Sequence, residues 1–440
     1  MKNLARMKQK IGQRIIIGFE GETLPKEIIR LDEEWGLGGV ILFKRNLIEP
    51  EQIFSLNESI MRLGKGTPPF IAIDQEGGRV TRLPEPFTIF PEMVCVGHHG
   101  TVSMAYEVGA IVGRELSVSG FNLNFAPVLD LDTNPNNPII GDRAISDQPE
   151  VVATLGRSLI QGLQDNHVVA CGKHFPGHGD TDSDTHLGRV ECHHDRETLL
   201  SSDTFPYRKL AEEDILNMVM LSHVHYPKID PDHPASLSSE VIQGLLRTEV
   251  GFRGVCVSDD LEMKAITDHY SVEEMTHRAF EAGLDIYLMC HTLEKQVEVL
   301  ETLLKIAEDP RVPKSAWDSP LRRIITVKKN CFNHENYIDR VHAMELIGAR
   351  EHVRISRRLR EDLNKRRNKQ AEAEAEAKAQ AEAKAQAKAE APAQAKTEAP
   401  AKEPQSQAEA QPDTSAQAQE ARAEDPPETD LSTESDESKS

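Results

Sequence analysis

The part of the sequence that says most about the fold is residues 168–181, which read VVACGKHFPGHGDT. Its first half is a run of apolar and small residues, without the alternation of a strand that has one solvent-exposed face. Continuous apolarity over so short a stretch is typical of a strand in a parallel sheet that is covered on both faces. The run ends in Lys173 and His174, and Gly177 and Gly179 follow. We therefore expect this strand to lead into a polar loop.

Runs of the same kind lie on both sides of this stretch, and most of them are followed by a segment with helical periodicity. They are residues 15–19, 39–43, 70–74, 121–129, 218–223, 254–258 and 284–290. Helix-like stretches include residues 51–63 and 102–118, and Ser271 with Glu274 has the pattern of a capping box at the start of another helix. Eight successive strand–helix units predict an α/β fold, a single (β/α)8 TIM-like barrel.

Charge is distributed unevenly along the chain of 440 residues, whose formal net charge is -21. Such a balance argues against general binding to nucleic acid or to an anionic membrane, because phosphates would be repelled. Residues 371–440 carry 17 acidic and 7 basic side chains and one large apolar side chain, Leu431, so they cannot bury a core. Residues 350–369 carry 9 basic and 3 acidic side chains. We therefore predict a barrel at 1–349, a basic helical collar at 350–370, and a low-complexity Ala/Glu/Lys/Gln/Pro tail at 371–440 that is disordered or partly helical.

Other features of the sequence concern location and partners. No apolar run approaches the ~18–20 residues of a membrane span, and the six cysteines are scattered without a C-x-x-C pattern, as is typical of thiols in a reducing compartment. We expect a cytoplasmic monomer without a membrane or nucleic-acid partner. The collar either binds an anionic partner or is a solvated helix face that pairs with the acidic tail, and the second interpretation is favoured.

Reactive side chains gather where the predicted strands end, which is where (β/α)8 barrels place their catalytic residues. A lone polar residue at such a position is usually a cap or a turn former, but so many at one mouth favour an active site. Asp74, Arg82, Arg143, Lys173 and His174 would supply the donors and acceptors that sugar hydroxyls require, with the three cations forming a basic exception in an acidic body.

Two further groups could carry chemistry. Asp259 follows an apolar strand and would lie at the rim, where it could attack an electrophilic carbon. Alternatively, Asp259 or its neighbour Asp260 caps the next helix, and periodicity does not decide which of the two faces the mouth. In an extended loop Asp184 and His186 would point the same way, so that the carboxylate fixes the imidazole tautomer and the other ring nitrogen exchanges a proton. The same loop is otherwise a solvated connection, or a metal site built from its His and Asp residues, although no tight ligand spacing supports a metal.

These residues closely resemble a known family. The run from Lys173 to Thr181, followed by Asp184-Thr185-His186, is similar to the signature of glycoside hydrolase family 3 β-N-acetylglucosaminidases. Residues 74–80 (DQEGGRV) and 258–263 (SDDLEM) match two further blocks in the family's order, and residues 141–143 (GDR) and 282–285 (AGLD) also fit. The resemblance covers residues 11–306, and we expect no counterpart here of the second domain that some relatives carry.

The resemblance implies a retaining exo-hydrolase that removes terminal β-linked N-acetylglucosamine. Bacterial cytoplasmic members act in cell-wall recycling on N-acetylglucosamine joined to 1,6-anhydro-N-acetylmuramic acid, with or without peptide. Carried over, Asp259 is the nucleophile, His186 the acid/base and Asp184 the residue that tunes it. Asp74, Arg82, Arg143, Lys173 and His174 would bind the sugar, and neither a metal nor an organic cofactor is expected.

Other functions remain open at this point. A relative could transfer the sugar to phosphate as a phosphorylase or act as a β-glucosidase. A metal-dependent TIM-barrel hydrolase, with the His and Asp residues of the loop as metal ligands, would belong to a different class of enzyme. A non-catalytic scaffold that acts through its tail is the least favoured hypothesis.

Overall fold

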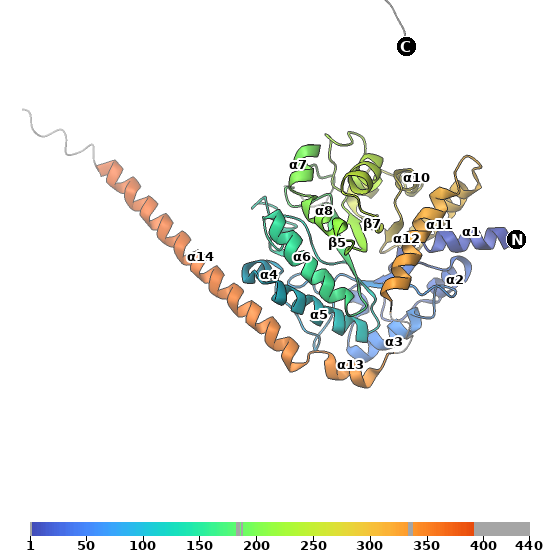
Figure 1. Cartoon of the computed structure of the whole chain (residues 1–440), viewed down its shortest axis with the longest axis horizontal. Helices are drawn as coiled ribbons and strands as arrows, with labels where there is room; N and C mark the ends of the chain where they lie inside the picture. Colours follow the sequence, from blue (N-terminus) through green and yellow to red (C-terminus); the bar gives the residue numbers. More distant parts are fainter. Residues whose placement is uncertain (1, 182–184, 186–187, 333–337, 391–440) are drawn as a thin grey trace, which may run out of the picture. The chain divides into compact units, whose positions relative to one another are not determined.

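Eight parallel strands close into a barrel in the computed structural model, which describes residues 2–181, 185, 188–332 and 338–390 (Figure 1). Each strand pairs with its neighbours in sequence order, and β1 pairs with β8. The strands are β1 (Ile15–Ile17), β2 (Gly39–Leu42), β3 (Phe70–Ile73), β4 (Leu123–Asn124), β5 (Val169–Phe175), β6 (Met218–Leu221), β7 (Val255–Asp260) and β8 (Ile286–Met289). The predicted (β/α)8 barrel is confirmed.

The structure also describes α-helices along the chain. They are α1 (Lys2–Gly12), α2 (Lys26–Trp35), α3 (Pro50–Ile60), α4 (Val94–His99), α5 (Val102–Val118), α6 (Pro149–Gln164), α7 (Arg196–Ser201), α8 (Phe205–Glu212), α9 (Lys264–Thr267), α10 (Val272–Ala282), α11 (Leu293–Glu308), α12 (Ser315–Cys331), α13 (Arg340–Leu346) and α14 (Arg350–Glu390). Short 3-10 helices η1 (Lys44–Asn46), η2 (Gly141–Arg143) and η3 (Ala235–Leu237) and a π-helix η4 (Glu240–Glu249) complete the elements. The predicted capping box is present at α10, where Ser271 and Glu274 each accept the other's backbone N–H. None of the described helices has the long uncharged apolar stretch that would cross a bilayer.

Strand β4 is shorter than the sequence indicates. Residues 121–129 are apolar except for Asn122 and Asn124, yet only Leu123 and Asn124 form the regular ladder. Pro127 has no N–H to donate, and the pairing with β5 resumes as one isolated bridge between Val128 and Lys173. The apolar run reflects burial on both faces, while proline decides where the ladder ends.

The apolar core has two layers because successive strand residues point to opposite faces. Ile16, Val169 and Val257 belong to the cluster inside the barrel, whereas Ile15 and Ile17 pack outward in the cluster beneath the helices. Continuous apolarity in the sequence is thus the sum of two buried faces.

Helix α12 contributes to the N-terminal end of the barrel. Its Ile324 and Val327 join the interior cluster, and Phe332 beyond it meets Phe70 edge to face at 5.4 Å. Buried Lys328 donates to the Gly38 carbonyl (2.7 Å), just before β2. Apolar packing at this end leaves the polar strand ends at the other as the place for a site.

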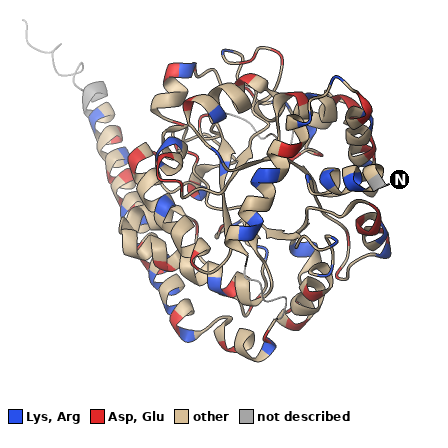
Figure 2. Cartoon of the chain, turned by 45° about the vertical axis from the view of Figure 1, so that its right-hand side comes forward, with Lys and Arg blue, Asp and Glu red and all other residues tan. Residues whose placement is uncertain are grey.

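The chain divides into two compact units, Met1–Glu372 and Ala373–Ser440. Within the first unit, the start of α14 is not only a solvated face. Leu359 and Leu363 are buried, and His352 pairs with Glu115 through Nδ1 and Oε1 at 2.7 Å. Elsewhere Lys, Arg, Asp and Glu are spread over helices and loops (Figure 2).

Candidate active site

A cavity of about 210 Å³ opens among the C-terminal ends of the strands. Its polar lining consists of Asp74, Glu76, Arg82, Arg143, Lys173, His174, His178, Thr185, Asp259, Asp260 and His291. Six of the residues predicted from sequence are therefore brought together: Asp74, Arg82, Arg143, Lys173, His174 and Asp259. The other two, Asp184 and His186, lie outside the described residues. Thr185, which stands between them in sequence, lines the cavity and is buried.

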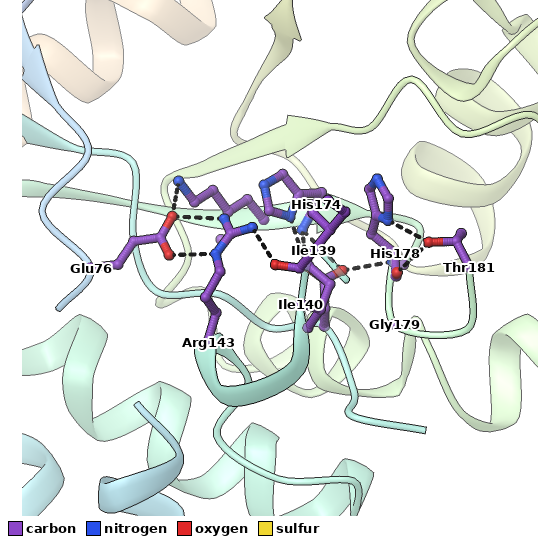
Figure 3. A network of polar contacts seen from close by, with 12 residues as sticks. Glu76, Ile139, Ile140, Arg143, His174, His178, Gly179 and Thr181 are labelled. Atoms are coloured by element: carbon purple, nitrogen blue, oxygen red, sulfur yellow. Dashed lines mark hydrogen bonds and ion pairs between the residues drawn. The ribbon is translucent and has the colours of Figure 1, made fainter. Parts of the chain in front are cut away.

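Two carboxylates and two cations form a connected network on one wall. The Lys173 ammonium contacts Asp74 Oδ1 at 2.7 Å and Glu76 Oε1 at 2.6 Å. The Arg143 guanidinium binds Glu76 in a bidentate pair, with Nε and Nη2 each 2.9 Å from a carboxylate oxygen (Figure 3). Bidentate Arg–carboxylate pairs fix orientation as well as charge, so the network holds Lys173 and Asp74 in place.

The charges in this network offset one another. Burial alone would raise the pKa of Glu76, but Lys173 and Arg143 hold that pKa well below its usual range. Burial likewise acts to lower the pKa of Lys173, and Asp74 and Glu76 raise it above its ordinary value. Glu76, Lys173 and Arg143 are thus ionised at neutral pH. The expectation of a basic pocket is wrong to this extent, because all three of its cations lie within 3.8 Å of a carboxylate.

Arg82 retains donor capacity. Its Nη2 lies 3.8 Å from Asp74 Oδ2 and its guanidinium lies 5.7 Å from the centre of the Phe43 ring. Its Nε is buried and finds no hydrogen-bond partner among the residues that the structure describes. Buried donors in native proteins are normally satisfied, so this N–H is available to a ligand acceptor.

An irregularity in β5 accompanies the placement of Lys173 and His174. Consecutive residues of a regular strand point to opposite faces, yet both side chains line the cavity. The pairing of β5 with β6 shifts register between Gly172 and Phe175, and such bulges re-aim side chains near active sites.

Buried Asp130, just beyond β4, orients the histidines. It accepts the His174 backbone N–H (3.1 Å) and the His178 backbone N–H (2.8 Å), and its Oδ2 lies 2.7 Å from His174 Nδ1. Because a carboxylate oxygen only accepts, His174 Nδ1 must carry a proton and donate this N–H to Asp130. The other ring nitrogen, Nε2, is not engaged by this carboxylate. Burial acts to raise the pKa of Asp130, but His174 holds it below its ordinary value.

Replacing Asp130 by Asn should lower kcat/KM by about 10- to 100-fold, the scale of hydrogen bonds to a charged group. An amide has one acceptor oxygen for three N–H groups and would direct its own donor at one of them. Steady-state kinetics with melting temperatures of both proteins is the measurement. Asp132→Asn, two residues on and half-buried, is the matched control and should stay within about twofold. Equal losses in the two variants would contradict the assignment.

His178 is held in the neutral form. Burial first, and then the neighbouring His174, lower its pKa to about 4. Its Nδ1 lies 2.8 Å from Thr181 Oγ1 (Figure 3). Its Nε2 lies 3.2 Å from Thr185 Oγ1. At neutral pH this imidazole is therefore uncharged and cannot act as a general acid. Its hydrogen bonds hold the chain in place at Thr181 and Thr185.

The two adjacent carboxylates at the end of β7 have different surroundings. Asp260 Oδ1 accepts the N–H groups of Glu262 (3.1 Å) and Cys290 (3.2 Å), and Oδ2 lies 3.2 Å from His291 Nε2. Asp259 accepts one N–H, that of Asp260, through Oδ1 at 2.8 Å. Burial would raise the pKa of Asp259, but His174, His223 and this N–H keep it below its ordinary value. Asp259 is thus an anionic carboxylate, and the described residues make fewer hydrogen bonds and ion pairs with it than with Asp260.

Sequence reasoning missed groups in and beside the cavity, and each depends on a contact between distant segments. Glu76 stood inside a quoted motif, but its bridge from Lys173 to Arg143 needs the segment after β3, strand β5 and η2 to meet. Asp130 contacts His174 from a position 44 residues earlier in the sequence. The pair Gly77 and Gly78, by contrast, accommodates the chain itself, since a Cβ on Gly77 would lie 2.7 Å from the Pro91 carbonyl oxygen.

Comparison with known proteins gives one consistent family. A profile of the glycosyl hydrolase family 3 N terminal domain matches residues 6–327. Over 273 residues the chain is 40% identical to a beta-hexosaminidase of Nitrosomonas eutropha, spanning 61% of this chain and 77% of that protein. Over 362 residues it is 33% identical to beta-hexosaminidase A of Pseudoalteromonas piscicida, and the match spans 73% of this chain but only 60% of that relative.

A solved structure agrees. NagZ from Neisseria gonorrhoeae, determined in complex with N-trifluoroacetyl-D-glucosamine, superposes with a TM-score of 0.65 at 31% identity, covering 79% of this chain and 96% of NagZ. Together with the profile match over residues 6–327, it confirms the family resemblance drawn from the sequence. The chain belongs to glycosyl hydrolase family 3.

Proposed function

We propose that this chain is a retaining exo-β-N-acetylglucosaminidase. The observation that carries the proposal is the anionic Asp259 in a cavity shared with the network of Asp74, Lys173 and Glu76. Beta-hexosaminidase is the name of its curated relatives, and NagZ was solved with an N-acylated glucosamine. A fixed carboxylate beside polar groups that match sugar hydroxyls is what glycoside cleavage requires.

Binding of the terminal sugar falls to the charged wall. Asp74 has acceptor oxygens for sugar hydroxyls, and Lys173, Arg143 and the Arg82 Nε–H are donors. Because Lys173 and Glu76 are buried and mutually ionised, their positions are set before substrate arrives. Such preorganised groups need little rearrangement when the transition state forms.

In the first chemical step an Asp259 oxygen attacks the anomeric carbon while the bond from that carbon to the leaving oxygen breaks. His186, protonated, gives its proton to the leaving oxygen, and a covalent glycosyl-enzyme results. In the second step neutral His186 takes a proton from water, the water oxygen attacks the same carbon, and Asp259 leaves. Two inversions retain the β configuration. Histidine differs from the usual carboxylic acid but titrates near neutral pH without an apolar pocket.

The finer part of the proposal concerns the substrate and its location. From the resemblance we infer that the aglycone is 1,6-anhydro-N-acetylmuramic acid, with or without peptide, and that the enzyme works in the cytoplasm as a monomer. Arg45 and Arg82 would bind the lactyl carboxylate of that aglycone. Their guanidinium groups lie 4.6 Å and 5.7 Å from the centre of the Phe43 ring. The six cysteines are free thiols, as a reducing compartment requires.

The test compares four β-linked substrates: N-acetylglucosaminyl-1,6-anhydro-N-acetylmuramic acid, chitobiose, and the 4-nitrophenyl glycosides of N-acetylglucosamine and glucose. We expect β-N-acetylglucosamine as the first product by NMR, the highest kcat/KM for the anhydro-disaccharide, and at least about 100-fold discrimination against the glucoside, which lacks the acetamido group. Equal turnover of the glucoside would indicate a β-glucosidase. Sugar-1-phosphate formed in phosphate buffer would indicate a phosphorylase.

A further inference from the structure

A second group of reactive side chains lies outside the cavity lining. Ligand atoms of Asp180, Cys192 and His194 all lie within 4.8 Å of one another. Cys192 is buried, whereas Asp180 and His194 are partly exposed, so an ion has access from solvent. Asp180 precedes residues 182–187 and the other two follow them, so the group joins two separate segments of the chain. None of the three lines the sugar cavity.

The donor set has the chemistry of a zinc site. Thiolate, imidazole and carboxylate are the groups that bind Zn²⁺, which takes four ligands in a tetrahedral arrangement. The three side chains supply one of each. With 39% of the Asp180 side chain exposed, a water molecule can reach the fourth position.

A fourth residue orients the imidazole as metal sites require. Asp203 Oδ2 lies 3.0 Å from His194 Nδ1, while Nε2 faces Asp180 Oδ2 at 2.9 Å. Metal-binding histidines almost always donate their other ring N–H to a carboxylate or carbonyl, which fixes the tautomer. Asp203 is buried, and a Cβ on Gly177 would lie 2.7 Å from its Oδ1. The orienting carboxylate is therefore held by packing.

The local charge also favours a cation. The His194 ring lies between two carboxylates, those of Asp180 and Asp203. Two carboxylates on either side of one ring favour a cation at this place. A zinc ion in place of the Nε2 proton would be neutralised by Asp180 and the Cys192 thiolate, since coordination deprotonates the thiol.

We propose that Asp180, Cys192 and His194 bind one Zn²⁺ ion, with Asp203 as the positioning residue. The ion takes no part in glycoside cleavage. It fastens the segment that ends at Asp180 to the segment that begins at Gly188, and so it stabilises the fold at the base of the loop that leads to Thr185.

The experiment uses the full-length protein, treated with chelator and then titrated with Zn²⁺ by calorimetry and with Co²⁺ by absorbance. We expect one equivalent of metal, a thiolate-to-cobalt band in the near ultraviolet, and a rise in melting temperature with zinc. Cys192→Ser and Asp203→Asn should each lower zinc affinity about 10- to 100-fold. Cys331→Ser removes the most exposed of the other thiols and should leave binding unchanged.

The variant Asp259→Asn tests whether zinc binds at this site or in the sugar cavity. Zinc binding that is unchanged in Asp259→Asn and weakened in Cys192→Ser supports the proposal. Binding lost in Asp259→Asn but kept in Cys192→Ser would place the metal in the cavity and overturn it. If Cys192→Ser fails to fold, the cobalt spectrum of the wild-type protein decides, because the absence of a thiolate band also overturns the proposal.

Discussion

Asp259→Asn should lower kcat/KM for N-acetylglucosaminides by on the order of 10⁴-fold or more, the scale on which enzymes lose activity without their nucleophile. The amide has the shape of the carboxylate but cannot form the glycosyl-enzyme bond. The wild-type residue is anionic, because His174, His223 and the Asp260 N–H offset the effect of burial on its pKa. Attack is therefore available at neutral pH without removal of a proton.

Trapping identifies the residue independently of kinetics. A 5-fluoro N-acetylglucosaminyl fluoride should leave one covalent sugar on the wild-type protein, and peptide mapping should place it on Asp259. In the variant Asp259→Ala, the smaller side chain leaves room for azide, which should restore cleavage of the substrate. The product should be the α-glycosyl azide, because azide attacks from the face that the carboxylate occupied.

Asp260→Asn is the matched control for the adjacent position. Its oxygens serve Glu262, Cys290 and His291, so this change should cost up to about tenfold and lower the melting temperature. Normal activity in Asp259→Asn, or a label on Asp260, would contradict the assignment of the nucleophile.

The sequence was sufficient for the barrel because each strand is buried on both faces, and double burial produces an apolar run that needs no alignment to detect. It was less informative about the ladder itself. Pro127 interrupts β4, and β7 continues past the apolar run to Asp260. Burial can be inferred from apolar residues, whereas the ends of the backbone hydrogen-bond ladder cannot be inferred from residue types alone.

The site could be predicted as a set of strand ends but not as a network. Asp74, Lys173 and Arg143 were expected to meet at one mouth, and they do. That Glu76 would join Lys173 to Arg143 depends on loop conformations between strands β3, β4 and β5. The same limit applies to Asp180, Cys192 and His194, because nothing in their spacing along the sequence shows that they come together.

His186→Ala should affect two substrates unequally, because an acid is needed only where the leaving oxygen is a poor leaving group. With a sugar aglycone, kcat/KM should fall by about 10²- to 10⁴-fold, the usual contribution of general acid catalysis. With the 4-nitrophenyl glycoside the first step needs no proton, whereas the second still lacks its base. The glycosyl-enzyme should therefore accumulate, giving a burst of one nitrophenol per enzyme followed by slow turnover in rapid-mixing experiments.

Azide distinguishes this role from that of Asp259. In His186→Ala it should accelerate the slow step by attacking the glycosyl-enzyme without base assistance, and the product should be the β-glycosyl azide, opposite in configuration to that from Asp259→Ala. His193→Ala changes an exposed histidine seven residues further along the sequence and should behave as wild type. His178 is a poor candidate for the acid, because burial lowers its pKa to about 4. Equal losses of His186→Ala on both substrates, without a burst, would mean that His186 supports structure and that another group transfers the proton.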